Sequence, residues 1–248
     1  MRYFIQFSYF GKAYHGWQNQ PNAITVQEVM EKALSTLLRD NISLVGAGRT
    51  DAGVHAQEMF AHFDVEDSLD CSDLANRLNS FLPEDIAIAQ IKKVKDGAHA
   101  RFDALSRTYE YWLVQHKNPF YTDNACEFLR PLNVDAMNHA AQILMEYDDF
   151  ECFSKSNTDV KTFICQLKGA VWQKQKDKLV FTITADRFLR NMVRAIVGTL
   201  LDVGTGKIQV EKVRDIVLSR DRGQAGVSVP AKGLYLTQIK YPHEIFYE

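Results

Sequence analysis

The stretch Gly46-Ala47-Gly48-Arg49-Thr50-Asp51-Ala52-Gly53-Val54-His55 constrains this chain more than any other part of it. Apolar, strand-like runs flank it on both sides, so it predicts a loop of small residues between two strands. Glycine adopts backbone angles that other residues resist, and it lets a ligand approach the main chain closely. Such a loop can present Asp51 in a cleft, with Arg49 two residues away. A tight turn in which the aspartate bonds its own backbone explains the loop equally well.

Four more segments, taken with this loop, resemble the motifs of the tRNA pseudouridine synthase A family. The loop itself matches the family's active-site signature through Gly48–Ala56. The other segments are Tyr14-His15-Gly16-Trp17-Gln18, Ser106-Arg107-Thr108-Tyr109-Glu110-Tyr111, Phe188-Leu189-Arg190-Asn191-Met192-Val193-Arg194 with Val197-Gly198, and Pro230-Ala231-Lys232-Gly233-Leu234. They run from one terminus to the other in the family's order, so the resemblance covers the whole chain.

Hydrophobic periodicity predicts a mixture of strands and helices in each half of the chain. Residues 2–10 alternate like a strand, and Thr25-x-x-Glu28 has the spacing of a capping box before a helix that ends near Asp40. In the second half, 188–201 has helical spacing. The pattern predicts an α+β fold. The resemblance implies two ferredoxin-like halves, 1–105 and 106–248, that form a continuous antiparallel sheet with helices on one face and a central cleft.

The resemblance also implies an activity, the isomerisation of uridine to pseudouridine in the anticodon stem-loop of tRNA (positions 38–40). Asp51 would be the essential carboxylate. It could attack C1′ of the ribose as a nucleophile, or remove the proton from C2′. Both roles need the ionised form, and the sequence does not choose between them. The family works as a homodimer that binds tRNA, so a homodimer is expected here.

Arg194 is the expected ion-pair partner of Asp51. Arg187, Arg190 and Arg194 are spaced three and four residues apart, so on a helix they would share a face. A guanidinium in contact with an aspartate keeps the carboxylate charged and orients it by bidentate hydrogen bonding. Arg187 and Arg190 are expected to contact RNA phosphates. Without the resemblance, a solvated basic face of an amphipathic helix would explain the three arginines.

Tyr109 and Arg49 are the remaining candidate site residues. The resemblance places the Tyr109 ring against the target base, whereas an inward tyrosine on a strand is usually part of the core. A base stacked in an RNA arm must turn outward before its sugar can react. Arg49 would then fill the vacated space or hold a flanking phosphate; its alternative role is to brace the loop.

Composition by itself does not favour an RNA-binding protein. The formal net charge is −2, with 10 basic and 14 acidic residues in 1–105 and 19 basic and 17 acidic residues in 106–248. Phosphate contacts supply most of the affinity for RNA, so a locally concentrated positive surface is required. The chain shows no phosphate-binding loop or dinucleotide fingerprint, and we expect no cofactor.

The cysteines and the chain's start exclude other classes of protein. Cys71, Cys126, Cys152 and Cys165 are scattered, which argues against a zinc ribbon and a disulfide framework, and no metal site is expected although His55 lies near Asp51. The sequence enters a strand pattern at once and has no long apolar run, so we expect a cytoplasmic protein with neither a membrane nor a DNA partner.

Two other functions are compatible with parts of the sequence. A non-catalytic RNA-binding module of the same fold would not need Asp51, Tyr109 and Arg194 together. A carboxylate-dependent hydrolase such as a glycosidase usually needs two carboxylates, and no second acid accompanies Asp51 in the loop.

Overall fold

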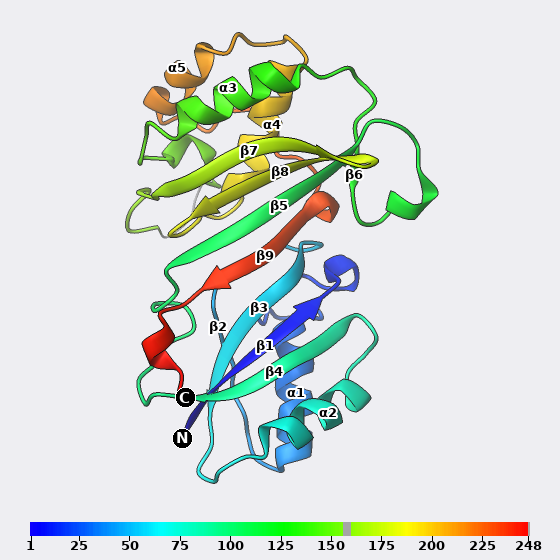
Figure 1. Cartoon of the computed structure of the whole chain (residues 1–248), viewed down its shortest axis with the longest axis vertical. Coiled ribbons are helices and arrows are strands. Elements are labelled where there is room, and N and C mark those ends of the chain that lie inside the picture. Colours follow the sequence, from blue (N-terminus) through cyan, green and yellow to red (C-terminus); the bar gives the residue numbers. More distant parts are fainter. Residues whose placement is uncertain (156–159, 248) are drawn as a thin grey trace. The chain divides into compact units, whose positions relative to one another are not determined.

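The structure, a computed structural model, describes residues 1–155 and 160–247 and divides into two compact units. The first unit consists of Met1–Leu105 together with Tyr235–Glu248, and the second of Ser106–Leu234 (Figure 1). The two units are described in turn.

The first unit combines five strands with two α-helices. Its elements are β1 (Arg2–Tyr9), α1 (Val26–Leu38), β2 (Val45–Gly46), β3 (His55–Asp64), α2 (Cys71–Phe81), β4 (Ile86–Val94) and β9 (Leu234–Lys240). The strand order is β4-β1-β3-β9, and β2 pairs with β3. The strands β4, β1 and β3 are antiparallel, whereas β9 runs parallel to β3. This pairing places the chain from Tyr235 onward in the first unit, although the sequence analysis assigns it to the C-terminal half.

The local sequence accounts well for β1 and α1. Alternate residues of β1 are buried on one face, as predicted; they are Tyr3, Ile5, Phe7 and Tyr9. The Thr25 hydroxyl accepts a hydrogen bond from the Glu28 amide (3.3 Å), which is the predicted cap of α1. The helix ends at Leu38, where Arg39 takes a left-handed conformation (φ 56°).

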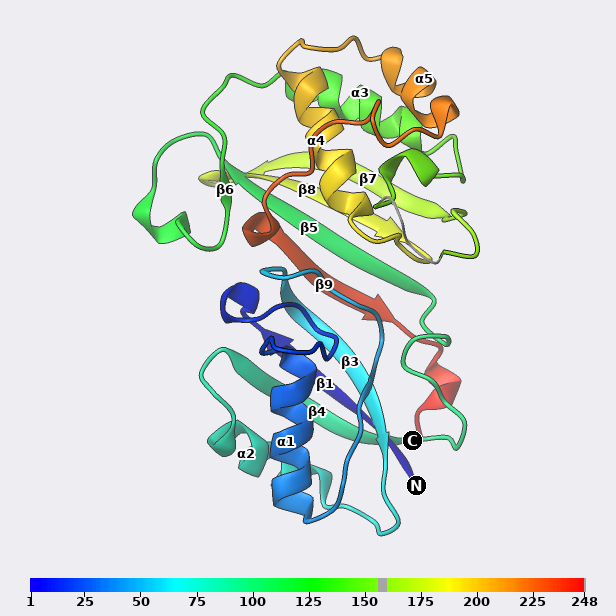
Figure 2. The same ribbon diagram turned by 180° about the vertical axis from the view of Figure 1, so that it is seen from behind.

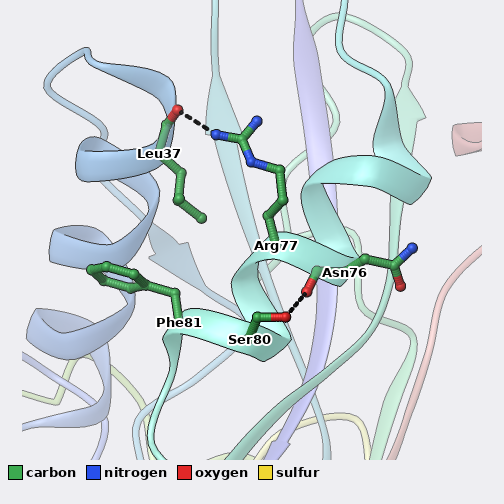
Figure 3. Close-up of a pocket in the computed structure, with 5 residues that line it drawn as sticks. All are labelled: Leu37, Asn76, Arg77, Ser80 and Phe81. Atoms are coloured by element: carbon green, nitrogen blue, oxygen red, sulfur yellow. Dashed lines mark hydrogen bonds between the residues drawn. The ribbon is translucent and has the colours of Figure 1, made fainter.

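The helices α1 and α2 cover one face of this sheet (Figure 2). The apolar spacing of 74–82 predicts that Leu74, Leu78, Phe81 and Leu82 face inward, but this is wrong for Phe81, which is 51% exposed. The helix α2 ends at Phe81, and Leu82 continues in an extended conformation that buries Leu82 instead. Phe81 lies beside Leu37, Asn76, Arg77 and Ser80 in a shallow groove between the two helices (Figure 3).

The other face of the sheet carries a histidine cluster. His62 is buried on β3, where its Nδ1 accepts a hydrogen bond from the Ala100 amide (3.1 Å) and its ring lies 4.7 Å from that of His99. Burial, together with the nearby charges of Arg2 and His99, lowers the pKa of His62 to about 4, against the opposite effect of Asp64 and Asp103. The folded protein therefore holds His62 neutral.

We expect the free energy of unfolding to fall as the pH drops from about 6.5 towards 4. Over this range His62 binds a proton in the unfolded state but stays neutral in the folded state. Above pH 6.5, His62 is neutral in both the folded and the unfolded state, so its titration no longer lowers the free energy of unfolding. Each pKa unit corresponds to about 1.4 kcal/mol, so the loss is on the order of 2–3 kcal/mol. Denaturant unfolding at several pH values checks this, with His62→Asn, whose side-chain oxygen can accept the same hydrogen bond, expected to flatten the slope. Exposed His116→Asn is the control and should leave the slope unchanged; equal slopes in all three proteins would contradict the assignment.

The second unit packs three helices with a second set of strands. Its elements are β5 (Ser106–Val114), β6 (Cys126–Glu127), α3 (Val134–Leu144), β7 (Leu167–Gln175), β8 (Lys178–Ala185), α4 (Met192–Gly204) and α5 (Lys212–Ser219). The strands β5, β8 and β7 are antiparallel in that order, and short β6 is parallel to β5. The apolar spacing of 134–145 predicts that Met137, Ala140, Ala141 and Leu144 face inward, and all four are buried.

The predicted α+β fold is confirmed, with one correction to the sheet. Its strands are mixed and not purely antiparallel, because β9 and β6 each pair with a parallel neighbour. The ferredoxin-like character of the halves, their junction in one sheet and the central cleft stay predictions. Within 1–155 and 160–247, no helix is long and apolar enough to cross a membrane.

Candidate active site

Asp51 occupies the first position of a four-residue turn in the first unit. The Val54 amide donates to the Asp51 carbonyl (3.2 Å), and Gly53 at the third position has φ +77°. A turn with positive φ at its third residue requires glycine or asparagine there. The side chain of Asp51 is half-buried. The glycine of the signature thus fixes the turn on which the carboxylate is presented.

A second segment, Tyr14–Trp17, holds this turn by backbone hydrogen bonds. The Gly53 amide donates to the Tyr14 carbonyl (3.2 Å) and the Trp17 amide to the Thr50 carbonyl (3.4 Å). Gly16 has φ +88°, and a Cβ atom there would lie 2.3 Å from the Thr50 carbonyl oxygen. Trp17 is 1% exposed and packs on Phe7. An aromatic residue in this segment can either present its ring to a base or pack in the core, and Trp17 packs under the loop.

Gly16→Ala should destabilise the protein, because it adds backbone strain at positive φ and a clash with a carbonyl that cannot move without the Asp51 turn. We expect a loss of about 2–4 kcal/mol in the free energy of unfolding. Gly48→Ala, in the signature loop, is the matched control, because its Cβ would meet nothing within 4 Å. Denaturant unfolding of both variants tests the prediction; equal stabilities would show that the contact with Thr50 yields at little cost.

His55 is a buried packing residue beside the turn. Its ring lies between Phe10 (4.2 Å between ring centres) and Tyr235 (4.7 Å), and its Nδ1 accepts a hydrogen bond from the Gly11 amide (2.9 Å). That bond occupies one of its two possible metal-binding nitrogens. In the described part of the chain, no group of three or more His, Cys, Asp or Glu side chains is arranged to hold a metal ion.

Arg49 is exposed in the same loop, two residues before Asp51. Thr50, between them, shares a hydrogen bond with the Tyr9 hydroxyl (2.8 Å). The loop around Arg49 is therefore held by Tyr9 and Tyr14–Trp17, while the role predicted for the arginine itself stays a prediction.

Tyr109 lies on β5 in the second unit and is half-buried. Phe188 contacts it edge-to-face, with ring centres 5.1 Å apart and an angle of 87°. Tyr111, two residues on and on the same face of the strand, is fully buried, and its hydroxyl donates to the Pro230 carbonyl (3.0 Å). Tyr109 is thus the more open of the two tyrosines in its motif.

Arg194 lies in the first turn of α4, and the start of this helix corrects the sequence analysis. The helix begins at Met192 and not at Phe188, because Asn191 is left-handed (φ 67°), a conformation that stops a right-handed helix and that asparagine tolerates. Arg187 and Arg190 therefore precede the helix and do not share a helical face with Arg194. Nearly every residue of α4 is buried, and Arg194 is a half-buried cation on it.

Arg194 is fixed by a reciprocal pair of hydrogen bonds to Val229. Its Nε donates to the Val229 carbonyl (2.7 Å), and its own carbonyl accepts from the Val229 amide (3.2 Å). The neighbouring Pro230 carbonyl holds Tyr111. Burial raises the pKa of Tyr111, while the positive charge of Arg194 acts on the same hydroxyl in the lowering direction. The structure thus brings Arg194 close to β5, the strand that carries Tyr109.

The other two arginines are held by backbone contacts. Arg187 is half-buried and its Nη1 donates to the Thr162 carbonyl (3.3 Å), while the carbonyl of exposed Arg190 accepts from the Lys155 amide (3.0 Å). Arg107 of β5 donates to the Asp186 carbonyl (2.7 Å). Arg187 and Arg190 thus lie in the segment that leads into α4, and Arg107 contacts the start of that segment.

The residues that hold the candidate site together have no signal in their local sequence. Val229 is one, and the others are Arg222, Gly226 and Ser228 before it. They lie about thirty residues from Arg194, and nothing in their local pattern indicates the contact. The pair Gly198 and Gly226 was the available signal, since glycines within and after a helix can mark a close backbone approach.

Comparison with known proteins identifies the family. The family model described as tRNA pseudouridine synthase matches residues 5–103 and 140–242. The chain is 52% identical to tRNA pseudouridine synthase A of Bacteroides thetaiotaomicron over 250 residues, which cover 100% of this chain and 93% of that protein. It is 51% identical to that of Porphyromonas gingivalis, with 99% of each chain covered, and 40% identical to that of Bacillus subtilis, with 97% and 99% covered. With motifs and sequence similarity in agreement along the chain, it belongs to the tRNA pseudouridine synthase A family, a family of isomerases.

Proposed function

We propose that this enzyme converts uridine to pseudouridine in the anticodon arm of tRNAs, with Asp51 as its essential catalytic carboxylate. The observation that carries the proposal is the Asp51 turn, in which the family signature coincides with a half-buried carboxylate on a backbone fixed from two sides. The relatives named tRNA pseudouridine synthase A, about half identical over the whole chain, support the substrate class.

The reaction needs no group beyond the chain's own side chains and the substrate. The bond between ribose C1′ and N1 of uracil breaks, the base turns, and C1′ joins C5; the proton of C5 leaves and N1 gains one. An ionised Asp51 serves by attacking C1′ or by removing the proton of C2′. Deuterium at C2′ slows the second route and leaves the first nearly unchanged, so the isotope effect distinguishes them.

Arg194 and Tyr109 are proposed to act with Asp51. The guanidinium keeps the carboxylate charged, and the half-buried ring of Tyr109 stacks on the target base, a contact worth about 1–3 kcal/mol. The expected ion pair joins residues of different units and stays a prediction, which a double-mutant cycle at Asp51 and Arg194 tests.

Arg49, Arg187 and Arg190 are proposed to contact RNA around the reacting nucleotide. Arg49 and Arg190 are exposed, and Arg187 is half-buried beside the start of α4. Because the net charge is −2, binding depends on such local groups and should weaken steeply with salt. A homodimer that offers one tRNA the surfaces of both subunits would add to this positive surface, and a cytoplasmic location suits an enzyme acting on tRNA; sedimentation at micromolar concentration tests the dimer.

The decisive experiment is incubation with an unmodified tRNA transcript, followed by mapping of pseudouridine. We expect product in the anticodon arm, and none in a transcript whose anticodon-arm uridines are replaced by cytidine. Product elsewhere in the tRNA would overturn the site assignment. Binding without any product would support the non-catalytic RNA-binding module.

A further inference from the structure

The segment Arg222–Val229, which follows α5, crosses α4 next to Arg194 and is called the strap here (Figure 2). The two backbones are in direct contact at a pair of glycines. A Cβ atom on Gly198 would lie 1.9 Å from the Val227 carbonyl oxygen, and one on Gly226 would lie 2.5 Å from the Thr199 amide nitrogen. The Gly226 amide also donates to the Thr199 hydroxyl (2.8 Å). The middle of the strap is therefore docked on α4 in one position.

Arg222 fixes the path of the strap from its other end. Its Nη1 donates to the carbonyls of Gly226 (3.1 Å) and Ala225 (3.4 Å), and its Nη2 donates to the Ser228 hydroxyl (2.8 Å). The same hydroxyl oxygen contacts Nδ2 of Asn191 (2.6 Å), the left-handed residue at the start of α4. One half-buried guanidinium thus ties three points of the strap together, next to the residue that sets where α4 begins.

The last residue of the strap holds Arg194. Val229 bonds Arg194 through both its amide and its carbonyl, so the position of the strap determines where the Arg194 side chain leaves the helix. A guanidinium side chain is long and flexible, and only a fixed anchor makes its direction reproducible. Misplacement of a catalytic group by about 1 Å can cost on the order of 100-fold in rate.

We propose that Arg222 is a positioning residue for the isomerisation: it holds the strap, and the strap aims the guanidinium of Arg194. This inference rests on the catalytic role proposed for Arg194. Arg222 does not itself contact RNA in this account, because both of its terminal nitrogens donate to acceptors within the strap.

The test compares single-turnover rates at saturating tRNA for Arg222→Ala and for Arg194→Ala, alone and together. We expect Arg222→Ala to lower the rate about 10- to 100-fold with little change in the Kd for tRNA. In the Arg194→Ala background the same substitution should add almost nothing, because the group it positions is gone. Arg220→Ala is the matched control: it removes the same charge two residues away, from a side chain that is exposed and paired with Asp149 (2.9 Å), and should leave rate and affinity unchanged.

Each other outcome has a distinct meaning. Equal rate losses from Arg222→Ala with and without Arg194 would show that Arg222 acts independently and would overturn the inference. A weaker tRNA affinity at an unchanged rate would make Arg222 a phosphate contact and would also overturn it. Full activity of Arg194→Ala alone would instead remove the catalytic role from which the inference starts. If Arg222→Ala fails to fold, Ser228→Ala removes the hydroxyl that Arg222 and Asn191 both contact, and it should show a smaller loss with the same dependence on Arg194.

Discussion

Asp51→Asn should abolish pseudouridine formation while tRNA binding stays nearly unchanged. Asparagine has almost the size and shape of aspartate, but its amide neither attacks C1′ nor accepts a proton from C2′. A general base contributes about 10²- to 10⁴-fold, and loss of a nucleophile costs at least as much, so we expect at least about 1000-fold loss in the single-turnover rate. Release of tritium from C5 of labelled uridine in tRNA measures the reaction, and filter binding measures the affinity.

The backbone of the turn should survive this substitution. The amides of Trp17, Gly53 and Val54 donate to the carbonyls of Thr50, Tyr14 and Asp51, and the nearly isosteric asparagine leaves these backbone hydrogen bonds in place. Asp51→Asn should therefore unfold at the same temperature as the parent, and Asp51→Glu should be folded and nearly inactive because its carboxylate is displaced. Exposed Asp67→Asn is the control for loss of one negative charge and should keep full activity. Measurable turnover by Asp51→Asn above about 10% of the parent rate would remove Asp51 from the chemistry.

Local signals predicted the elements where side chains next to each other in sequence decide the structure. The Thr25 cap predicted the start of α1, and the alternation in β1 predicted its buried face. The start of α4 was predicted four residues too early, because 188–193 contains no glycine or proline and its apolar spacing continues the helical pattern. The break comes from the left-handed conformation of Asn191, beside its contact with Ser228, a residue 37 positions away.

The candidate site shows the same division. The positive φ of Gly53 belongs to a local turn, which the glycines of the signature loop predict. The contact of Gly16 with Thr50 and that of Val229 with Arg194 join segments that are distant in the sequence. The local sequence of one segment does not indicate which other segment it will contact. The motif resemblance points to Arg194, whereas the helical face that Arg187, Arg190 and Arg194 would share does not exist in the structure, because α4 begins at Met192. The family motif thus indicates Arg194 as a site residue, whereas only the structure shows that Val229 holds it.

Arg194→Ala should lower the single-turnover rate about 100- to 1000-fold, the range seen when one preorganised electrostatic group is removed from an active site. The physical reason is that the guanidinium of Arg194 is half-buried and held through Nε. It can therefore stabilise the charge of the Asp51 carboxylate without first moving or losing much bound water. Arg194→Lys keeps the charge but lacks the planar donor fork and the bond to Val229, so it should recover only part of the rate. Exposed Arg77→Ala on α2 is the control for loss of one positive charge.

Salt dependence separates this role of Arg194 from simple RNA binding. If Arg194 contacted a phosphate, its removal would weaken tRNA binding and reduce the dependence of log Kd on log salt concentration by roughly the share of one phosphate contact. A catalytic Arg194 leaves that dependence unchanged while the rate falls. Arg190→Ala, at an exposed residue proposed to contact phosphate, should show the opposite pattern, with weaker and less salt-dependent binding at a nearly normal saturated rate. If both variants weakened tRNA binding and left the rate unchanged, Arg194 would be one more contact with the RNA phosphate backbone. A group other than Arg194 would then have to keep the Asp51 carboxylate ionised.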